Sequence, residues 1–362
     1  HFMQKEIFEQ PQAIRDTLES RITNDSVISS SFGNKSDEIF RSIDQIQIVA
    51  CGTSYNAGLV AKYWIEDIAK IPCNVEIASE YRYRRPIILD DTLFITLSQS
   101  GETADTVEAL KEAKKINDTL KSLCISNTPE SSLIRLSDLK FLTHAGPEIG
   151  VASTKAFTTQ LVSLALLICS IGKIKKSINK KQEKEIINGL KKLPGLIAKA
   201  LNQENQIKKL SKRFKRKNSV LFLGRGTMHA IAMEGALKLK EISYIHAEAY
   251  PAGELKHGPI ALIDKDMPVI AIAPNDSLLD KLKSNLQEVK SRGSQMIVFE
   301  DENSKVKSMD AMEVIPVTSN LGRITAPIIF SIPLQLLSYH VALIKGTNVD
   351  KPRNLAKSVT VE

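Results

Sequence analysis

The stretch from Ser98 to Thr103 has the residue types and spacing of a phosphate-binding turn. It follows an apolar segment typical of a strand, Thr92–Leu97, and precedes Ala104–Lys115, whose apolar residues recur at helical spacing. A helix that starts directly after a strand leaves backbone N–H groups unpaired at its N-terminus. Neighbouring serine and threonine hydroxyls would complete the donor set that a phosphate monoester needs. The alternative is an ordinary Ser/Thr-rich cap between a strand and a helix.

Two more turns in the first half of the chain carry small hydroxyl residues, namely 51–54 and 151–154. The turns at matching places in the second half are 224–227 and 274–277, and the latter contains Asp276 where a phosphate would need donors. A phosphate site is therefore expected in the first half. Neither half completes the G-x-G-x-x-G pattern of a dinucleotide site.

Groups suited to acid–base chemistry occur in the second half. Glu234, Lys238 and Glu241 recur at i, i+4 and i+7 and would share one helix face. A carboxylate beside an ammonium group stays ionised and can act as a base. A surface salt-bridge ladder is the alternative interpretation of the same spacing.

One histidine and one lysine are further candidates. His257 lies among glycine and proline residues, which predicts an exposed loop where it can titrate near neutrality. His340, by contrast, lies in an apolar helical segment and is predicted to be structural. Lys357 belongs to a terminal segment, 350–362, that is too apolar and too constrained by proline to be a frayed tail. In a partly desolvated setting, Lys357 could serve as an amine nucleophile.

The chain repeats itself, which indicates how these residues are positioned. Segments of the first half have counterparts in the second half: 46–54 in 219–227, 93–97 in 269–273, 124–126 in 296–298, and 157–168 in 330–343. Each half alternates short apolar strands with helical segments, which is typical of a parallel sheet covered on both faces. The expected fold is α/β, with two tandem related domains. Ligands of such sheets bind at the turns that follow the strands.

The repeat gives a domain plan. We expect a helical lead-in over residues 1–40, a first domain over 41–172, a helical connector over 173–217, a second domain over 218–349 and a tail over 350–362 that closes the active site. Pro11 is predicted to begin a helix at Ala13–Ser20, and Pro194-Gly195 to break the connector.

Composition narrows the class of protein. With 362 residues, 43% hydrophobic and 25% charged, the chain reads as a soluble globular protein. The longest apolar run, Leu161–Ile171, is too short to span a bilayer, and no secretion signal opens the chain, so we expect a cytoplasmic protein. The four cysteines lack the spacing of metal ligands, and most of them are expected to be buried thiols: Cys51, Cys73, Cys124 and Cys169. No metal and no cofactor are expected.

The net charge of +8 comes largely from two lysine-rich stretches, 173–192 and 208–217. They would form either a nucleic-acid patch or a solvated helical face, and the lack of a stacking aromatic series favours the solvated face. The opening residues, His1-Phe2-Met3, are not a natural beginning, and we expect an excised fragment whose upstream part is missing.

Together these motifs resemble the isomerase domains of the glutamine:fructose-6-phosphate amidotransferase, or glucosamine-6-phosphate synthase, family. The resemblance covers the full length and is carried by residues 3–7, 51–55, 98–103, 151–155, 234–250, 253–259 and 350–362. The serine turns mark the wider sugar isomerase (SIS) superfamily. The run E-G-A-L-K-L-K-E-I-S-Y-I-H-A-E-A-Y and the tail D-K-P-R-N-L-A-K-S-V-T-V-E are specific to the synthase family. The resemblance implies two tandem SIS-type, flavodoxin-like domains.

The resemblance also implies substrates and residue roles. Fructose-6-phosphate, glucosamine-6-phosphate or glucose-6-phosphate would bind in the first half. The phosphate would be held by Ser98, Gln99, Ser100 and Thr103, and the sugar contacted by Cys51, Gly52, Thr53, Ser54, Val151, Ala152, Ser153 and Ala356. Lys357 would form an imine with the C2 ketone, and His257, donated by the other subunit of a homodimer, would open the ring. Glu241 would move the proton between C1 and C2, assisted by Lys238 at the C1 hydroxyl.

The family carries a glutaminase domain upstream of the isomerase, and this sequence lacks it. The fragment is therefore expected to be unable to hydrolyse glutamine. No nucleic-acid or membrane partner is expected. The main alternative is a non-catalytic SIS protein that senses sugar phosphates, which would not need Glu241, His257 and Lys357 together. A related deglycase or phosphohexose isomerase is disfavoured because the tail matches the synthase family.

Overall fold

Two compact units, each built on its own parallel sheet, make up the computed structural model of the chain, which describes residues 1–306, 312–319 and 321–360. We call them the β1–β5 unit and the β6–β10 unit. The β1–β5 unit comprises Gln12–Glu148, Lys155–Lys192 and Ala356–Glu362, and the β6–β10 unit comprises His1–Pro11, Ile149–Thr154 and Leu193–Leu355. Helices α1 (Phe2–Leu18) and α8 (Lys180–Leu201) have residues in both units.

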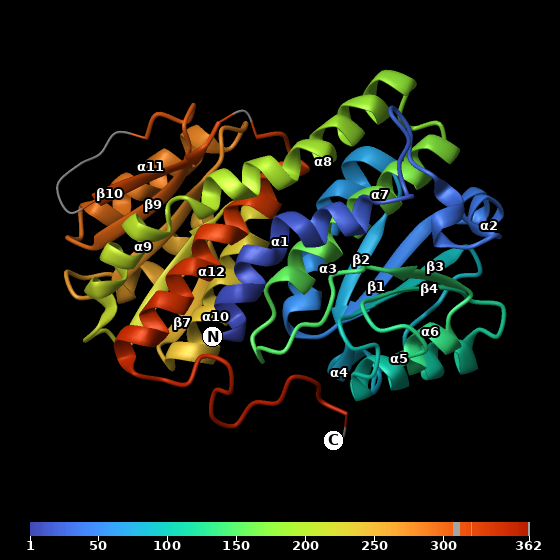
Figure 1. The fold of residues 1–362 in the computed structure, drawn as a ribbon, viewed down its shortest axis with the longest axis horizontal. Coiled ribbons are helices and arrows are strands. Elements are labelled where there is room, and N and C mark those ends of the chain that lie inside the picture. The colour runs from blue at the N-terminus through green and yellow to red at the C-terminus, as the bar shows by residue number, and fades with distance from the viewer. Residues whose placement is uncertain (307–311, 320, 361–362) are drawn as a thin grey trace. The chain divides into compact units, whose positions relative to one another are not determined.

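The β1–β5 unit has five parallel strands in the order β2-β1-β3-β4-β5. The strands are β1 Gln45–Ala50, β2 Cys73–Ile77, β3 Thr92–Ser98, β4 Lys121–Ser126 and β5 Leu139–Leu142. The helices are α2 Ser36–Ser42, α3 Gly52–Trp64, α4 Ala78–Tyr81, α5 Ala104–Ile116, α6 Ser132–Leu136 and α7 Lys155–Ile174. Helices α4, α5 and α6 cover one face of the sheet, and α3 and α7 the other (Figure 1).

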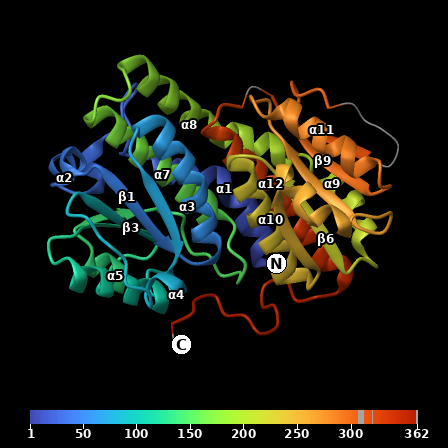
Figure 2. The ribbon, with the colours of Figure 1, turned by 180° about the vertical axis from the view of Figure 1, so that it is seen from behind.

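The β6–β10 unit repeats this arrangement, with parallel strands in the order β10-β9-β8-β6-β7. They are β6 Ser219–Gly224, β7 His246–Pro251, β8 Pro268–Ala273, β9 Gln295–Asp301 and β10 Met312–Thr318. The helices are α9 Glu204–Ser211, α10 Thr227–Ser243, α11 Leu279–Lys290 and α12 Thr325–Lys345. Helix α11 closes one face, while α10 and α12 pack together on the other (Figure 2). The expected pair of flavodoxin-like α/β domains is confirmed.

Helix α7 of the β1–β5 unit and its counterpart in the β6–β10 unit, α12, are the most apolar long helices of the two units. Both are long and apolar enough to cross a membrane by length and composition, with a mean hydropathy of 1.6. In each, 89% of that apolar window is buried inside the protein. Burial within a packed unit accounts for their composition, because core helices are apolar on all sides.

Two expectations about helix boundaries are wrong. Helix α1 runs through Pro11 instead of starting after it, and α8 runs through Pro194. Proline cannot donate to the carbonyl four residues earlier, which for Pro11 is that of Ile7. The side chain of Gln10 donates to the Ile7 carbonyl at 2.9 Å and satisfies it. Along α8, burial of Leu190, Leu193, Ile197 and Ala200 offsets the cost of the proline.

The strand order places the predicted turns at one edge of the β1–β5 sheet. Strands β1 and β3 are neighbours, with Ala50 paired to Leu97, and the helices that follow them cover opposite faces. In such sheets the crevice beyond the carboxyl ends of these two strands is where ligands bind. The turn 51–54 follows β1 and the turn 98–103 follows β3, so both flank this crevice.

Candidate active site

The turn after β3 is held in shape by its own hydroxyl groups. Ser98 is buried; its Oγ accepts the Gly101 N–H at 3.0 Å and lies 2.9 Å from the Thr103 Oγ1. The Ser100 Oγ accepts the Glu102 N–H at 3.2 Å. Ser98 therefore shapes the turn from inside, while Gln99, Ser100 and Thr103 are partly exposed along it.

Gly101 is the position where this turn tolerates no side chain. Its φ is +67°, a left-handed conformation that costs other residues energy. A Cβ atom here would lie 2.0 Å from the Ser131 Oγ and 2.5 Å from the Ser131 Cβ. Backbone conformation and space both require glycine.

We expect Gly101→Ala to lower the free energy of unfolding by about 3 kcal/mol, from left-handed strain and overpacking together. The control is Gly195→Ala in α8, where nothing lies within 4 Å of the added Cβ. That change should stabilise the chain by at most about 1 kcal/mol, the helix preference for alanine. Urea unfolding measures both, and equal effects would show that the turn is not tightly built.

The turn after β1 is open on its outer side. Gly52 has φ +52°, and a Cβ atom added there would meet nothing within 4 Å, so its backbone is accessible to a ligand. Burial raises the pKa of the Cys51 thiol, which lies 4.0 Å from the Thr106 hydroxyl. The Ser54 Oγ accepts a hydrogen bond from Gln160 at 3.0 Å. With its pKa raised, Cys51 stays a thiol at neutral pH, which suits a contact residue better than a nucleophile.

The terminal tail is fastened to the β1–β5 unit next to the Ser98–Thr103 turn. The Ser358 Oγ lies 3.0 Å from the Ser100 Oγ, and the Val359 carbonyl accepts the N–H of Ala104, the first residue of α5, at 3.0 Å. Thr103, the N-cap residue of α5, makes no side-chain capping bond. The first N–H of α5 is therefore accepted by the tail backbone and not by the Thr103 side chain.

Lys357 is partly desolvated. Its side chain is 22% exposed, and its Nζ lies 2.5 Å from an oxygen of Glu148, whose side chain is fully buried. The preceding residue, Ala356, is exposed. Val361 and Glu362, the last residues of the predicted tail, lie outside the described residues.

The acid–base residues of α10 form a buried cluster within the β6–β10 unit. The Lys238 Nζ lies 2.6 Å from the Glu241 Oε2 and 3.6 Å from the Glu234 Oε1. The side chains of Lys238 and Glu234 are 1% and 2% exposed, and that of Glu241 is 20% exposed. A surface salt-bridge ladder is therefore wrong, because the side of α10 that carries these residues is covered. Glu241 is the most accessible of the three.

The two histidines singled out from the sequence differ in exposure. His257 is exposed at the end of a short 3₁₀ helix, Ala252–His257, as expected. His340 is buried, with its Nε2 3.3 Å from Glu204, which agrees with a structural role.

The turn 151–154, expected in the first half, belongs to the β6–β10 unit, where the Val151 N–H donates to the Asp350 carbonyl at 3.1 Å. Ala152 is buried in this turn, while Val151 and Ser153 are partly exposed.

The matching crevice of the β6–β10 unit is occupied by the chain's own side chains. The Arg225 guanidinium lies against Gly253 and donates to the Asn285 Oδ1 at 3.1 Å. Asp276 accepts the Leu278 N–H at 2.8 Å, and burial raises the pKa of its carboxyl group. A filled crevice with a carboxylate supports a phosphate site in the β1–β5 unit instead.

Glu148 is the residue that sequence reasoning missed. One carboxylate oxygen contacts Lys357 and the other accepts the Ala156 N–H in the first turn of α7 at 3.0 Å. It lies alone in a loop, with no motif around it. The available signal was indirect: α7 has no acidic residue in its first turn, where the helix dipole favours a negative charge.

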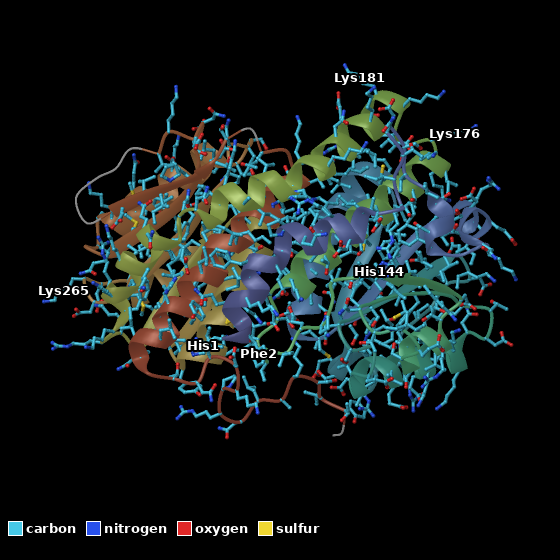
Figure 3. The ribbon with its side chains drawn as sticks, viewed as in Figure 1. His1, Phe2, His144, Lys176, Lys181 and Lys265 are labelled. Carbon is cyan, nitrogen blue, oxygen red and sulfur yellow. The ribbon has the colours of Figure 1, made fainter. Side chains whose placement is uncertain are left out.

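The cysteines and surface lysines show no further site. All four cysteines are free thiols, and among the described residues no group of three or more His, Cys, Asp or Glu side chains could hold a metal ion. Lys176 and Lys181 point away from the ribbon (Figure 3), and Lys184 pairs with Asp25 at 3.2 Å. These features support a solvated face for the lysine-rich stretches.

Comparison with known proteins finds the same domain twice in the chain, once for each sheet. The SIS domain model matches residues 39–170 and 213–345. Glutamine–fructose-6-phosphate aminotransferases (isomerizing) of Pseudomonas syringae pv. tomato and Escherichia coli K12 are 57% and 56% identical over all 362 residues. The chain spans 59% of the length of each of these relatives.

A solved structure matches almost from end to end. It is the C-terminal domain of glucosamine-fructose-6-phosphate aminotransferase from Francisella tularensis, with 53% identity and a TM-score of 0.95, covering 97% of this chain and 98% of that one. The chain therefore belongs to the SIS domain family and, within it, to the C-terminal domains of the glucosamine-fructose-6-phosphate aminotransferases.

Proposed function

We propose that this chain binds fructose-6-phosphate and forms glucosamine-6-phosphate by ketose–aldose isomerisation, with ammonia from a glutaminase domain of the same full-length protein. One observation carries the proposal: a partly desolvated lysine is fastened beside a phosphate-type turn in one unit. Ser358, the neighbour of Lys357, contacts Ser100 at 3.0 Å. The tail segment that carries the amine is thus attached to the turn that we propose for the phosphate.

The substrate is held in the crevice beyond β1 and β3. Ser98, Ser100, Thr103 and the backbone at Gln99 bind the phosphate. The sugar contacts the open backbone at Gly52. The proposed sugar contacts are Cys51, Gly52, Thr53, Ser54, Val151, Ala152, Ser153 and Ala356.

Four further groups perform the isomerisation. His257 opens the sugar ring, and Lys357 forms an imine with C2, which acidifies the C1–H bond. Glu241 takes the C1 proton and returns it at C2. Lys238, bonded to Glu241 at 2.6 Å, fixes that carboxylate and assists at the C1 hydroxyl.

Ser100→Ala tests the phosphate site. We expect it to weaken glucosamine-6-phosphate binding by about 1–2 kcal/mol, the scale of a hydrogen bond lost to a charged group. Calorimetry measures the change, and Thr103→Ala should act in the same direction. If both variants bind as tightly as the parent chain, the phosphate lies elsewhere and the proposal fails.

We also propose a homodimer in which His257 serves the site of the other subunit. Its exposure at the end of a short helix supports this, as do large apolar side chains left on the surface at Tyr83 and Ile87, which are 68% and 91% exposed.

A mixed-dimer experiment tests the shared site. Inactive His257→Ala chains mixed with inactive Glu241→Gln chains should regain part of the activity, because one site of each mixed dimer draws on both intact residues. Subunit exchange is verified by native mass spectrometry. No recovery after exchange would mean that each chain builds its site alone.

The cellular setting is proposed on the same grounds. Four free cysteines fit a reducing cytoplasm, and the product would enter amino sugar biosynthesis towards UDP-N-acetylglucosamine. We further propose the domain limits 41–172 and 218–349, joined by a helical connector over 173–217.

A further inference from the structure

Glu148 connects three parts of the β1–β5 unit. It lies in the loop after β5, and its Oε1 accepts the N–H of Ala156 at 3.0 Å at the start of α7. Its Oε2 lies 2.5 Å from the Nζ of Lys357 in the tail. The side chain is fully buried, so both oxygens are fixed in place by protein groups.

A carboxylate is well placed at this end of α7. The helix is 20 residues long and has no acidic residue in its first turn. The unpaired N–H groups of that turn and the helix dipole favour a negative charge. A second buried cation, Lys155, begins α7, and its Nζ lies near Gly146 in the same loop as Glu148. The Ala156 N–H and the Lys357 Nζ hold the two Glu148 oxygens in one orientation.

Burial makes the partner of this anion specific. A carboxylate removed from water needs a cation and hydrogen-bond donors around it. Lys357 supplies a cation, and the contacts of Ser358 and Val359 keep the tail at that place. The position of the Lys357 amine is therefore set by a side chain outside the tail.

We propose that Glu148 is a positioning residue for Lys357, which holds its Nζ and takes up its proton when the amine attacks the substrate carbonyl. The inference rests on the proposed role of Lys357 as the imine-forming amine. An ammonium group has no lone pair and cannot attack a carbonyl carbon. At 2.5 Å the Glu148 Oε2 is within reach of the proton that must leave.

The proton balance closes without another reactant. The Lys357 ammonium gives one proton to Glu148, and the resulting amine adds to C2, with a proton shifting from nitrogen to the C2 oxygen. Glu148 then returns its proton to that hydroxyl, which leaves as water. The products are the protonated imine, water and the Glu148 carboxylate.

Glu148→Gln tests the inference, because glutamine keeps the size and the acceptor for Ala156 but cannot take a proton. The full chain is mixed with fructose-6-phosphate and excess cyanoborohydride, and mass spectrometry follows the adduct on Lys357 between pH 6 and 10. We expect the adduct to form about 100-fold more slowly at pH 7. The deficit should shrink as the pH rises, because hydroxide then removes the Nζ proton.

Controls separate this role from a structural one. Glu108→Gln removes an exposed carboxylate that pairs with Lys111 at 2.6 Å, and should trap at the parent rate. Glucosamine-6-phosphate binding should be unchanged in Glu148→Gln. A deficit of equal size at every pH, or a parent-like pH profile, would overturn the inference.

Two other outcomes are also decisive. If Glu148→Gln does not bind glucosamine-6-phosphate, Glu148→Asp is measured instead. Its shorter side chain moves the carboxylate away from the Lys357 amine and should slow formation of the trapped adduct about tenfold. A rate equal to that of the parent chain would overturn the inference. An adduct absent from the parent chain would overturn the role of Lys357 itself, and the inference with it.

Discussion

Replacing Lys357 by arginine is expected to abolish the adduct that borohydride traps from fructose-6-phosphate. Arginine keeps the positive charge and can still pair with the Glu148 carboxylate, which lies 2.5 Å from the lysine amine. The guanidinium group does not lose its proton in proteins, so it forms no imine. Mass spectrometry of peptides that contain residue 357 measures the loss, which should be complete.

The control for this experiment is Lys111→Arg, a surface lysine of α5 paired with Glu108. It should leave the adduct on Lys357 unchanged. A parent-chain adduct on Lys238, or on no lysine, would contradict the role assigned to the tail. Either result would leave the Ser98–Thr103 turn as a binding site without its proposed nucleophile.

Replacing Glu241 by glutamine is expected to lower the rate of glucose-6-phosphate formation from fructose-6-phosphate by about 10²–10⁴-fold. The loss of a general base lowers the rate of a proton-transfer step by a factor of this size. Glutamine keeps the shape of the side chain and can still accept the hydrogen bond from Lys238. A coupled assay for glucose-6-phosphate measures the rate.

The matched control is Glu313→Gln, which removes a surface carboxylate that pairs with Arg213 in the same unit. It should leave the rate within about threefold, as expected of a surface change. Glucosamine-6-phosphate should bind Glu241→Gln as it binds the parent chain. A Glu241→Gln chain with full activity would remove Glu241 from the reaction and leave another group to move the proton.

Much of the fold is predictable because local pattern and global fold agree. The repeated strand-and-turn segments at 46–54 and 219–227 predict parallel sheets, and the observed strand orders match between the units. The helices that run through Pro11 and Pro194 could not be predicted from the proline positions, because a side-chain hydrogen bond in α1 and burial along α8 offset the cost of each proline. The Gln10 side chain repairs the lost bond at Pro11, and nothing in the spacing of Gln10 announces that.

The site was predictable in part for the same reason. The Ser98–Thr103 turn has a local sequence signature: its hydroxyl groups make hydrogen bonds within the turn, and its glycine has a positive φ. The burial of Lys238 was not predictable from helical spacing, since the same i, i+4 pattern occurs on exposed helices. Glu148 was missed because its partners, Ala156 and Lys357, come together only when the chain is folded.

Incubation of this chain with fructose-6-phosphate in D₂O, followed by NMR, tests the central claim most directly. The account predicts slow formation of glucose-6-phosphate that carries deuterium at C2, because a base that takes the C1 proton exchanges part of it with solvent. Tight binding of fructose-6-phosphate with no glucose-6-phosphate and no exchange at C1 would contradict the account and identify a protein that senses sugar phosphates without converting them.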